Sequence, residues 1–449
     1  MFIQKIKSDG LAHLSYIVGS SGAACVIDPR RDCEIYMDIA AEHGASITRI
    51  IETHRNEDLI SGAPILSDMT GATVLHGPNA DGDVAYAKIV TDGYEVSCGA
   101  LRLRVIETPG HTYDSISIAI LDTNFDDEIV GVFTGDALFV GDVGRTDFYP
   151  GETEKVAGLL YDSLQKLMEL GDQALLYPAH GAGSVCGDGM ADREFSTLGY
   201  ERKNNPMLNK ASREAFIEAK LNERHYVPPY FSRMEHLNLV GGSAMPRVIA
   251  PKPLEPGEFD QKRTSTVVDV RSIGSFASAH IPGSLAIPES MLSAFAGYFL
   301  DADDKLTLVA DNPEQARSAV RYLARLGFDH VEFYLDSVVG YAANGGHLDT
   351  LNFVDTSIVK SRLEDDQDGW VLLDVRSINE FETGHIGGAK HLYAGLVPQD
   401  SDFLDPKKTY TVMCGSGARA TVAASWMQVS GFGDVDVYLG SMGAWNAQN

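Results

Sequence analysis

The sequence has few cysteines, and they are not arranged in pairs. Five cysteines are scattered along 449 residues without a Cys-x-x-Cys motif. A disulfide framework usually has an even number of cysteines, and a cysteine-ligated zinc site has closely spaced cysteine pairs. We therefore expect neither feature, and we expect most of these residues to be reduced thiols.

Long hydrophobic runs and an excess of basic residues are also absent. No stretch of about 18 apolar residues occurs that would form a transmembrane helix, and the first residues lack the layout of a secretory signal. The chain has 36 Lys and Arg against 63 Asp and Glu, a formal net charge of −27. Because nucleic-acid binding requires basic patches, we expect no nucleic-acid partner. The lack of a transmembrane run and of a secretory signal leads us to expect a cytoplasmic protein with no membrane partner.

The second half of the chain contains an internal repeat. Val267–Ser272 has the sequence VVDVRS and recurs as LLDVRS in Leu372–Ser377. In each copy a His-Ile pair follows, with His280 and His385 each 11 residues after the aspartate of the motif. The copies are offset by 105 residues, which is the length of a domain rather than of a solenoid repeat.

Each copy alternates short apolar runs with helix-like stretches, such as Tyr410–Met413 before Ala418–Gln428. This alternation is typical of an α/β domain with a parallel sheet. The proline-rich segment Ile249–Gly257 is typical of a linker. The predicted boundaries are 1–245 for an N-terminal unit, 246–262 for the linker, and 263–350 and 357–449 for the two copies.

In the N-terminal unit, potential metal ligands follow strand-like apolar runs. Side chains just past strand ends can converge on one site at the edge of a sheet. A single histidine in such a place is more often a structural residue, but the repeated strand-loop context favours a shared metal site. The five candidates are His54, Asp58, His111, Asp136 and His180.

The segments around these candidates resemble the metallo-β-lactamase superfamily, and the resemblance implies an αββα sandwich. In that family the first motif is Thr-His-x-His-x-Asp-His and serves two metal subsites. This sequence has Asn56 and Leu59 in place of the second and third histidines. The matching segments are Thr53–Asp58 (THRNED), Pro109–Thr112 (PGHT), Thr134–Asp136 (TGD) and Pro178–Gly181 (PAHG).

The two replacements favour one metal ion over two, because a dinuclear zinc hydrolase of the glyoxalase II type needs both missing imidazoles. The persulfide dioxygenase branch of the superfamily instead uses a single iron, and its ligand pattern maps onto His54, His111 and Asp136. Two imidazoles and a carboxylate with open positions are typical of non-haem Fe(II) oxygenases. The resemblance therefore implies mononuclear Fe(II), with Asp58 and His180 orienting ligands or waters. The alternatives are a Zn(II) hydrolase and a domain without metal.

Two further residues match the same branch. Arg145, in the segment Gly144–Asp147, either binds a carboxylate or phosphate of the substrate or forms a structural salt bridge. Cys186 lies six residues after His180 among small residues. It either holds a persulfide or contacts the substrate, or it is an unreactive thiol.

The second copy of the repeat carries a candidate nucleophile, Cys414, between a predicted buried strand and a predicted helix. Backbone N–H groups at such a junction stabilise an anion. This setting favours the thiolate and would stabilise a persulfide on Cys414. Arg419 can bind an oxyanion such as sulfite or thiosulfate. The persulfide-binding loop would be Gly415, Ser416, Gly417 and Ala418, whose glycines permit the tight turn.

The Asp-Val-Arg motif, the His-Ile pair and the Cys-to-Arg loop together resemble the rhodanese family over residues 357–449. A tyrosine phosphatase loop begins with His-Cys, whereas Met413 precedes Cys414 here. The first copy has no cysteine in the equivalent stretch, where we expect Asp311 or Asn312 at its position. That copy therefore resembles an inactive rhodanese that serves as a spacer or docking surface.

The whole chain resembles multidomain persulfide dioxygenase–rhodanese fusions. The resemblance implies that O2 oxidises a small-molecule thiol persulfide to sulfite at the iron. It further implies that Cys414 transfers sulfur to give or consume thiosulfate in sulfide detoxification, and that the protein is a homo-oligomer. The alternatives are a zinc thioester hydrolase with an appended sulfur carrier and a sulfur-trafficking protein in which only Cys414 reacts. The sequence leaves the carrier thiol open among glutathione, coenzyme A and others.

Overall fold

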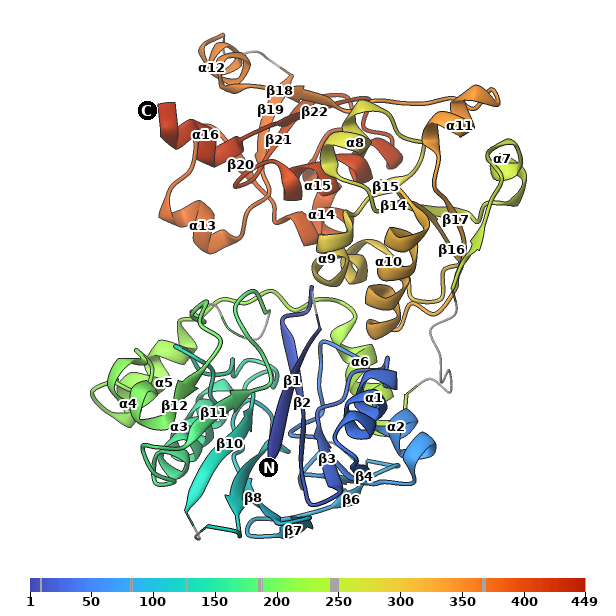
Figure 1. The fold of residues 1–449 in the computed structure, drawn as a ribbon. Helices are drawn as coiled ribbons and strands as arrows, with labels where there is room; N and C mark the ends of the chain where they lie inside the picture. Colours follow the sequence, from blue (N-terminus) through green and yellow to red (C-terminus); the bar gives the residue numbers. More distant parts are fainter. Residues whose placement is uncertain are drawn as a thin grey trace. The chain divides into compact units, whose positions relative to one another are not determined.

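The computed structural model describes residues 1–8, 10–80, 82, 84–125, 128–184, 187, 189–242, 250–365 and 369–448. The chain divides into two compact units, 1–247 with 325–327 and 248–324 with 328–449. Figure 1 shows the helices and strands of both units, and each unit is described by itself. Among the described helices, none combines the length and apolar character that a membrane span requires.

The first unit contains two six-stranded mixed sheets, with strand orders β1-β2-β3-β4-β5-β6 and β12-β11-β10-β9-β8-β7. In the first sheet β1 to β3 pair antiparallel and β3 to β6 pair parallel. The strands of the first sheet are β1 (Phe2–Ser8), β2 (His13–Ser20), β3 (Ala23–Ile27), β4 (Ser46–Ile51), β5 (Thr73–His76) and β6 (Lys88–Ile89). Those of the second are β7 (Glu95–Cys98), β8 (Leu101–Glu107), β9 (Ile116–Asp122), β10 (Ile129–Gly135), β11 (Leu175–Pro178) and β12 (Ser196–Thr197).

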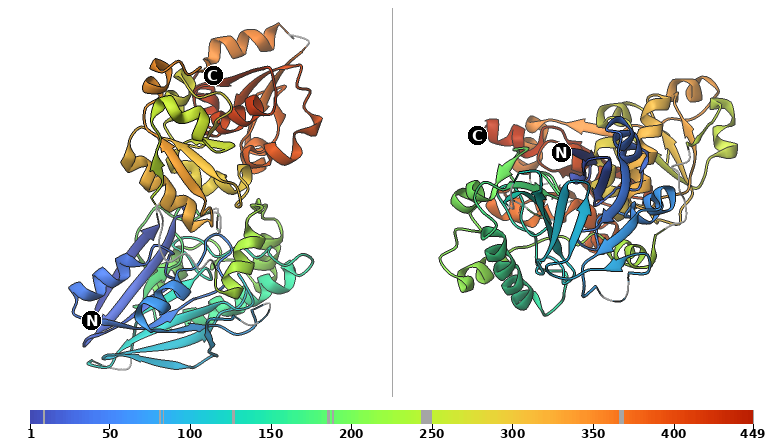
Figure 2. Two further views of the ribbon diagram at one scale, coloured as in Figure 1. Left: turned by 90° about the vertical axis from the view of Figure 1, so that its right-hand side faces the viewer. Right: turned by 60° about the horizontal axis from the view of Figure 1, so that its bottom comes forward.

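Helices cover the outer face of each sheet, as Figures 1 and 2 show. On the first sheet, Tyr36 and Leu66 pack in one core cluster with Ile17. On the second, Leu160 packs with Val132. This arrangement confirms the predicted αββα sandwich. The helices are α1 (Glu34–Glu42), α2 (Ala63–Thr70), α3 (Thr153–Met168), α4 (Leu198–Asn204), α5 (Arg213–Leu221) and α6 (Phe231–Val240).

The apolar strands of this unit are buried on both faces. Successive residues of a strand point to opposite sides of its sheet. In β2, Tyr16 belongs to the core between the sheets, whereas Ile17 belongs to the core under the helices. In β10, Phe133 and Val132 divide in the same way. Sheets covered on both sides therefore require nearly continuous apolar runs, which are the runs that precede the candidate ligands.

The second unit contains two five-stranded sheets with the same topology. Their orders are β13-β17-β16-β14-β15 and β18-β22-β21-β19-β20. All strand pairs are parallel, which confirms the predicted pair of α/β domains. The strands are β13 (Lys252–Pro253), β14 (Thr266–Asp269), β15 (Leu285–Ala286), β16 (Leu306–Val309), β17 (Val331–Leu335), β18 (Asn352–Val354), β19 (Trp370–Asp374), β20 (Lys390–His391), β21 (Thr409–Met413) and β22 (Asp434–Tyr438).

Helices connect these parallel strands, as the crossover between parallel neighbours requires. In the first domain they are α7 (Phe259–Lys262), α8 (Ile273–Ser278), α9 (Leu292–Phe299), α10 (Pro313–Arg325) and α11 (Val338–Ala343). In the second they are α12 (Thr356–Glu364), α13 (Ile378–Thr383), α14 (Val397–Asp400), α15 (Ala418–Val429) and α16 (Ser441–Gln448).

The repeated Asp-Val-Arg motif has a structural role in both domains. Asp269 and Asp374 end a buried strand, and neither is exposed to solvent. The arginine two residues later donates to its own aspartate at 2.6 Å, Arg271 in one domain and Arg376 in the other. A buried carboxylate needs such charge-assisted bonds. The motif therefore marks the fold and not the chemistry.

The boundaries of the first parallel domain differ from the predicted ones. Residues 252–262, which we predicted as part of a linker, pack in this domain: β13 pairs with β17, and Phe259 is fully buried. Pro253 lies in an edge strand, where a missing N–H group is tolerated. Similarly, β18 begins before residue 357 and pairs with β22. Residues 246–249 lie outside the described residues.

Candidate metal centre and sulfur-transfer site

The predicted metal ligands follow four strands of the first unit. His54 follows β4, His111 follows β8, Asp136 follows β10 and His180 follows β11. Strands β8, β10 and β11 run in the same direction within their sheet. The loops after them therefore lie at the same edge, and this brings residues far apart in the sequence together.

The imidazole of His54 is oriented by its neighbour Thr53. The Thr53 hydroxyl donates to a carboxylate oxygen of Asp28 at 2.9 Å, so its oxygen accepts from His54 Nδ1 at 3.0 Å. A neutral imidazole carries one proton, so Nε2 then holds a lone pair. His54 Nε2 is buried and has no hydrogen-bond partner among the described residues.

His111 is held in the same tautomer by a backbone carbonyl group. Its Nδ1 donates to the carbonyl oxygen of Arg145 at 3.0 Å. Its Nε2 faces Glu57 Oε1 at 3.1 Å, which is a hydrogen bond when the ring is protonated and a metal-binding lone pair when it is neutral. Gly110 allows the loop to approach α3, because it has φ +144° and a Cβ atom there would lie 2.3 Å from the backbone of Leu160.

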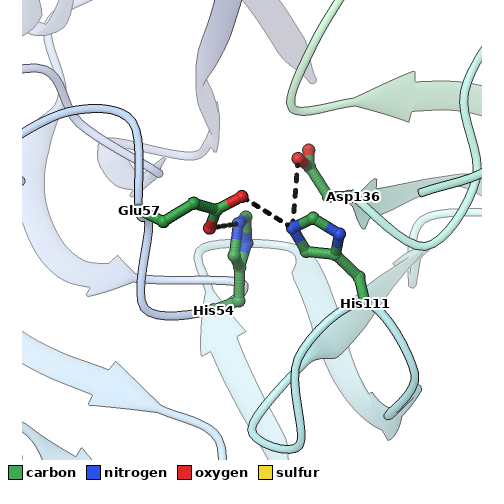
Figure 3. A group of neighbouring side chains, drawn as sticks. All are labelled: His54, Glu57, His111 and Asp136. Carbon is green, nitrogen blue, oxygen red and sulfur yellow. Dashed lines mark hydrogen bonds and ion pairs between the residues drawn. The ribbon is translucent and has the colours of Figure 1, made fainter. Parts of the chain in front are cut away.

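The two imidazoles meet two carboxylates in a buried cluster, which Figure 3 shows. His54, Glu57, His111 and Asp136 offer ligand atoms that all lie within 4.8 Å of one another. Each residue is at most 1% exposed. Imidazole nitrogens and carboxylate oxygens that converge in a buried space favour a shared positive charge, which a proton on His111 or a bound metal ion can supply. Because imidazole nitrogen and carboxylate oxygen are ligands of both iron and zinc, the residues fit a metal ion.

Asp58 and His180 lie beside this cluster in a hydrogen-bonded chain. His180 Nδ1 donates to Asp136 at 2.8 Å, and its Nε2 donates to Asp58 at 2.9 Å. Burial disfavours the charged ring, but the two carboxylates hold the pKa of His180 well above its usual value. Burial also opposes ionisation of Asp136, yet His180 and His111 hold the pKa of that carboxyl well below its usual value. With both nitrogens engaged, His180 orients Asp136 and does not face the cluster as a ligand.

The sequence alone did not single out Glu57. It occupies a variable position of the family motif. Its place between two candidate ligands, His54 and Asp58, was the only feature of the sequence that could have indicated a metal-binding role. In the structure its Oε1 lies 3.1 Å from His111 Nε2, and its Oε2 lies 3.8 Å from His54 Nε2. The histidines keep the pKa of Glu57 below its usual value although burial opposes this.

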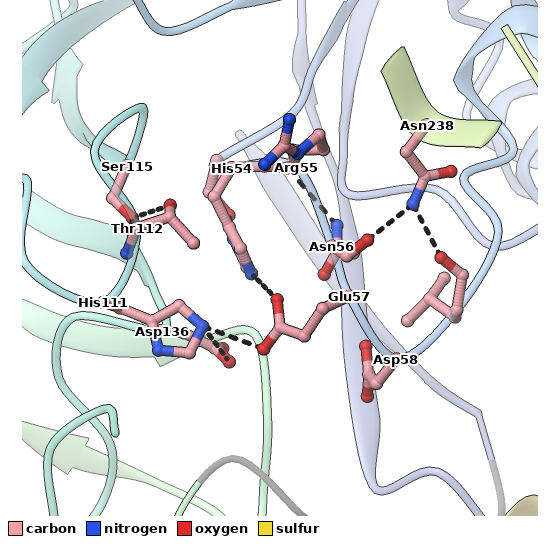
Figure 4. A network of polar contacts seen from close by, with 12 residues as sticks. His54, Arg55, Asn56, Glu57, Asp58, His111, Thr112, Ser115, Asp136 and Asn238 are labelled. Atoms are coloured by element: carbon pink, nitrogen blue, oxygen red, sulfur yellow. Dashed lines mark hydrogen bonds and ion pairs between the residues drawn. The ribbon is translucent and has the colours of Figure 1, made fainter. Parts of the chain in front are cut away.

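A helix residue distant in sequence fixes the loop that carries Glu57, as Figure 4 shows. Asn238 of α6 donates from Nδ2 to the carbonyl oxygens of Asn56 and Leu59, at 2.7 and 2.8 Å. Its side-chain oxygen accepts from the backbone N–H of Ser61 at 2.9 Å. Three bonds from one buried amide therefore set the path of the altered motif.

Arg145 forms the structural ion pair that was one of its two predicted roles. Its guanidinium donates to both carboxylate oxygens of Asp147 at 2.6 and 2.7 Å, and the residue is 1% exposed. It also donates to the carbonyl oxygen of Tyr226 at 3.2 Å. Its contribution to the cluster is the backbone carbonyl that orients His111. Cys186 lies outside the described residues.

A cavity of about 350 Å³ opens beside His180. Its walls include Lys5 and Lys7 of β1, the glycine-containing segment 181–183, and Arg193. Lys7 forms an ion pair with Glu194, so the basic groups of this wall are partly balanced. Lys5 also pairs with Glu194, and Arg193 pairs with Glu201, so these basic groups already have acidic partners. The size suits a small organic ligand.

In the second unit, Cys414 lies at the predicted junction of strand and helix. It follows β21 directly and is 1% exposed. Its Sγ accepts the backbone N–H of Gly417 at 3.1 Å, and its own N–H donates to Ser441 Oγ at 3.1 Å. Gly417 has φ +113°, a conformation that favours glycine. The loop therefore directs a backbone donor at the sulfur atom.

Arg419 is held by a carboxylate from the neighbouring helix. Its two terminal nitrogens donate to Glu380 at 2.6 and 2.8 Å. Burial opposes ionisation of Glu380, but the bonds from Arg419 and Ser377 lower its pKa to about 2. The predicted oxyanion-binding arginine is thus positioned by an ion pair beside the Cys414 loop.

In the first parallel domain, Ala310 occupies the position of the nucleophile. Val309 pairs with Asp269, and Met413 pairs with Asp374. The residues that follow, Ala310 and Cys414, are therefore equivalent, and neither Asp311 nor Asn312 is. Helix α10 begins three residues after Ala310, whereas α15 begins four residues after Cys414. The loop after Ala310 is therefore one residue shorter than the loop after Cys414, and this difference left the equivalent of Cys414 undetermined from the sequence.

Comparison with known proteins identifies both units. Residues 8–180 match the metallo-beta-lactamase superfamily, and residues 255–344 and 355–448 match the rhodanese-like domain. The hydroxyacylglutathione hydrolase of Rhodopseudomonas palustris (strain BisA53) is 32% identical over 201 residues, 44% of this chain and 71% of that protein. The chain belongs to the metallo-beta-lactamase superfamily. This superfamily member also carries two rhodanese-like domains.

The chain is also similar to two further proteins. The mitochondrial persulfide dioxygenase ETHE1 of Bos taurus is 29% identical over 223 residues, 46% of this chain and 76% of that protein. The crystal structure of a metallo-beta-lactamase from Staphylococcus aureus subsp. aureus COL has a TM-score of 0.67 at 28% identity, and covers 75% of this chain and 98% of its own. The resemblance to persulfide dioxygenase–rhodanese fusions is confirmed at the level of domains. The chain spans about half the length of other curated relatives, 52%, 58% and 47% of three of them.

Proposed function

We propose that this protein oxidises the persulfide of a small thiol with O2 and passes sulfur through Cys414. In the first reaction the outer sulfur of the persulfide loses four electrons to O2. With one water molecule, the products are sulfite, two protons and the free carrier thiol. The metal would be a single Fe(II) held by His54, His111 and Asp136.

The observation that carries this proposal is the tautomer of the two histidines. The Nδ1–H group of each ring is donated away from the cluster, to Thr53 in one case and to the Arg145 carbonyl in the other. Both Nε2 atoms are thereby presented to one site together with Asp136. When bound there, Fe(II) supplies open coordination positions and the redox chemistry that O2 requires. The role of the protein is to hold the ligands, exclude bulk water and orient Asp136 through His180.

The second reaction needs no metal. The Cys414 thiolate attacks the outer sulfur of a persulfide, the S–S bond breaks, and the carrier thiolate leaves and takes up a proton. Sulfite then attacks the outer sulfur of the Cys414 persulfide, which gives thiosulfate and restores the thiolate. The N–H group of Gly417 would stabilise the anionic sulfur in both states. One chain that carries both sites raises the effective concentration of sulfite near its acceptor.

The alternative is a zinc thioester hydrolase, because one of the relatives is named a hydroxyacylglutathione hydrolase. Against it, Asn56 and Leu59 stand where a dinuclear site needs imidazoles. The cavity beside His180 has room for a small carrier under either proposal. It does not distinguish between them.

The deciding experiment combines metal analysis with oxygen uptake. The full chain is purified, its metals are measured by mass spectrometry, and it is offered glutathione persulfide or a glutathione thioester. We expect iron near one ion per chain, oxygen uptake with the persulfide, and sulfite as the product. Zinc together with thioester cleavage and no oxygen uptake would establish the hydrolase instead. The absence of both activities would leave only the sulfur-carrier role of Cys414.

A further inference from the structure

We propose that Glu57 is a fourth protein ligand of the metal, so that the centre contains two imidazoles and two carboxylates. The inference rests on the metal site of the proposed function, but not on the oxygenase reaction. It concerns a residue at a variable position of the superfamily motif.

The distances around Glu57 are those of ligands that share one ion. Two ligand atoms bound at about 2.1 Å lie about 3.0 Å apart at a right angle and about 3.4 Å apart in a tetrahedron. Glu57 Oε1 lies 3.1 Å from His111 Nε2, and Oε2 lies 3.8 Å from His54 Nε2. The separation of His111 Nε2 from Asp136 Oδ2 is 3.5 Å. Glu57 therefore meets the cluster as closely as the predicted ligand Asp136 does.

The orientation of the rings points the same way. Figure 3 shows the Glu57 carboxylate between the two imidazoles, with one oxygen toward each. His54 Nε2 has no hydrogen-bond partner among the described residues and is buried. Because the Nδ1 atoms of both rings already have acceptors, both Nε2 atoms face the Glu57 carboxylate, and His111 Nε2 forms a hydrogen bond with it at 3.1 Å. A metal ion bound here would take the place of the proton in that hydrogen bond and would be shared by both rings and the carboxylate.

The loop that carries Glu57 is held firmly enough to deliver a ligand. The residues on either side, Asn56 and Asp58, are at most 3% exposed. Asn238 binds the backbone of Asn56 and Leu59, and Asp58 bonds with His180. Glu57 is thus placed by contacts on both of its sides and not by its own side chain alone.

A fourth ligand changes what the centre can accept. With a metal bound, four protein ligands would leave fewer coordination positions open to reactants than three would. The added negative charge also favours a hard divalent or trivalent cation and compensates for the imidazoles missing at Asn56 and Leu59.

The test measures metal binding rather than turnover. Metal-free full-length protein is loaded with Co(II), and its affinity is measured by competition with a chelator while its visible spectrum is recorded. We expect Glu57→Gln to weaken binding at least about tenfold and to shift the Co(II) bands. The matched control is Glu201→Gln, a buried glutamate bonded to Ser196 and Asn205 outside the cluster. The control is expected to retain the affinity and spectrum of the unsubstituted protein.

Each result decides the proposal. Unchanged affinity and spectrum in Glu57→Gln would overturn the ligand role and leave the proposed function standing. Failure of the unsubstituted protein to bind any metal would overturn both. Circular dichroism of the metal-free forms checks that the variants fold. Should Glu57→Gln not fold, a crystal structure of the metal-loaded unsubstituted protein decides. A Glu57 oxygen within about 2.2 Å of the ion supports the proposal, and one beyond about 3 Å rejects it.

Discussion

His180 and Asp136 are joined by a charge-assisted hydrogen bond of 2.8 Å between Nδ1 and a carboxylate oxygen. The other ring nitrogen is held by Asp58 at 2.9 Å. The imidazole therefore acts as a fixed link between a loop of the first sheet and a ligand candidate of the second. Such supporting bonds determine how well a ligand is oriented before the metal binds.

Replacement of His180 by glutamine should weaken metal binding about 10–100-fold, because Asp136 loses its charged donor. The measurement is chelator competition on the full chain. His43→Gln, which changes an exposed histidine of the same unit, serves as control and should change nothing. Equal affinities of His180→Gln and the unsubstituted protein would show that Asp136 needs no such support.

Replacement of Cys414 by serine should separate the two proposed reactions. We expect sulfite formation from glutathione persulfide to stay within about twofold, and thiosulfate formation to fall to background, because the hydroxyl is a much weaker sulfur acceptor. Both products are quantified by chromatography. Loss of sulfite as well as thiosulfate would mean that the two sites do not work independently.

The Glu380–Arg419 pair should stabilise the second unit at neutral pH and fail in acid. The pKa of Glu380 is lowered to about 2 from a usual value of 4.5. A lowered carboxylate pKa gives stability above the usual pKa, and this stability is lost as the pH falls toward 2. The stability deficit of Glu380→Gln relative to the unsubstituted protein should therefore shrink between pH 5 and pH 2.

Urea unfolding followed at several pH values measures this effect. Glu364→Gln, an exposed glutamate of the same domain, is the control. A deficit of Glu380→Gln that stays constant across this range would show that the ion pair does not contribute. Unfolding of the two units has to be resolved separately, since the first unit has its own acid-sensitive groups.

Replacement of Asn238 by aspartate should loosen the loop that carries the altered motif. The carboxylate has the same shape but cannot donate to the carbonyl oxygens of Asn56 and Leu59, which then lack these bonds in a buried place. We expect a loss of about 2–4 kcal/mol in the free energy of unfolding. Asn222→Asp, at an exposed helix end, should lose less than about 0.5 kcal/mol. A similar loss in both variants would contradict the proposed role of Asn238.

Local patterns were sufficient for most of the fold. The continuous apolar runs before His54 and Asp136 belong to strands buried on both faces, so their loops were predictable from hydrophobicity alone. The repeated Asp-Val-Arg motif identified two equivalent domains because a buried aspartate needs its arginine nearby. In both cases the pattern that allowed the prediction lies within a few consecutive residues.

Tertiary contacts account for what was not predicted. Asn238 and Asn56 are 182 positions apart, and no local spacing connects them. Glu57 became a ligand candidate only when β4 and β8 brought His54 and His111 around it. The equivalence of Ala310 and Cys414 could be established only from the register between strands. The sequence alone did not show it, because the loops that follow differ in length by one residue.

The alanine at position 310 limits the storage capacity of the chain. Since Cys414 is the only cysteine after position 186, the proposed sulfur transfer has one loading site in the two rhodanese-like domains. Under the proposed function, thiosulfate would then leave in single equivalents, each after a fresh loading event. Titration of the loaded protein with cyanide should accordingly release one thiocyanate per chain from this unit, however large the supply of persulfide.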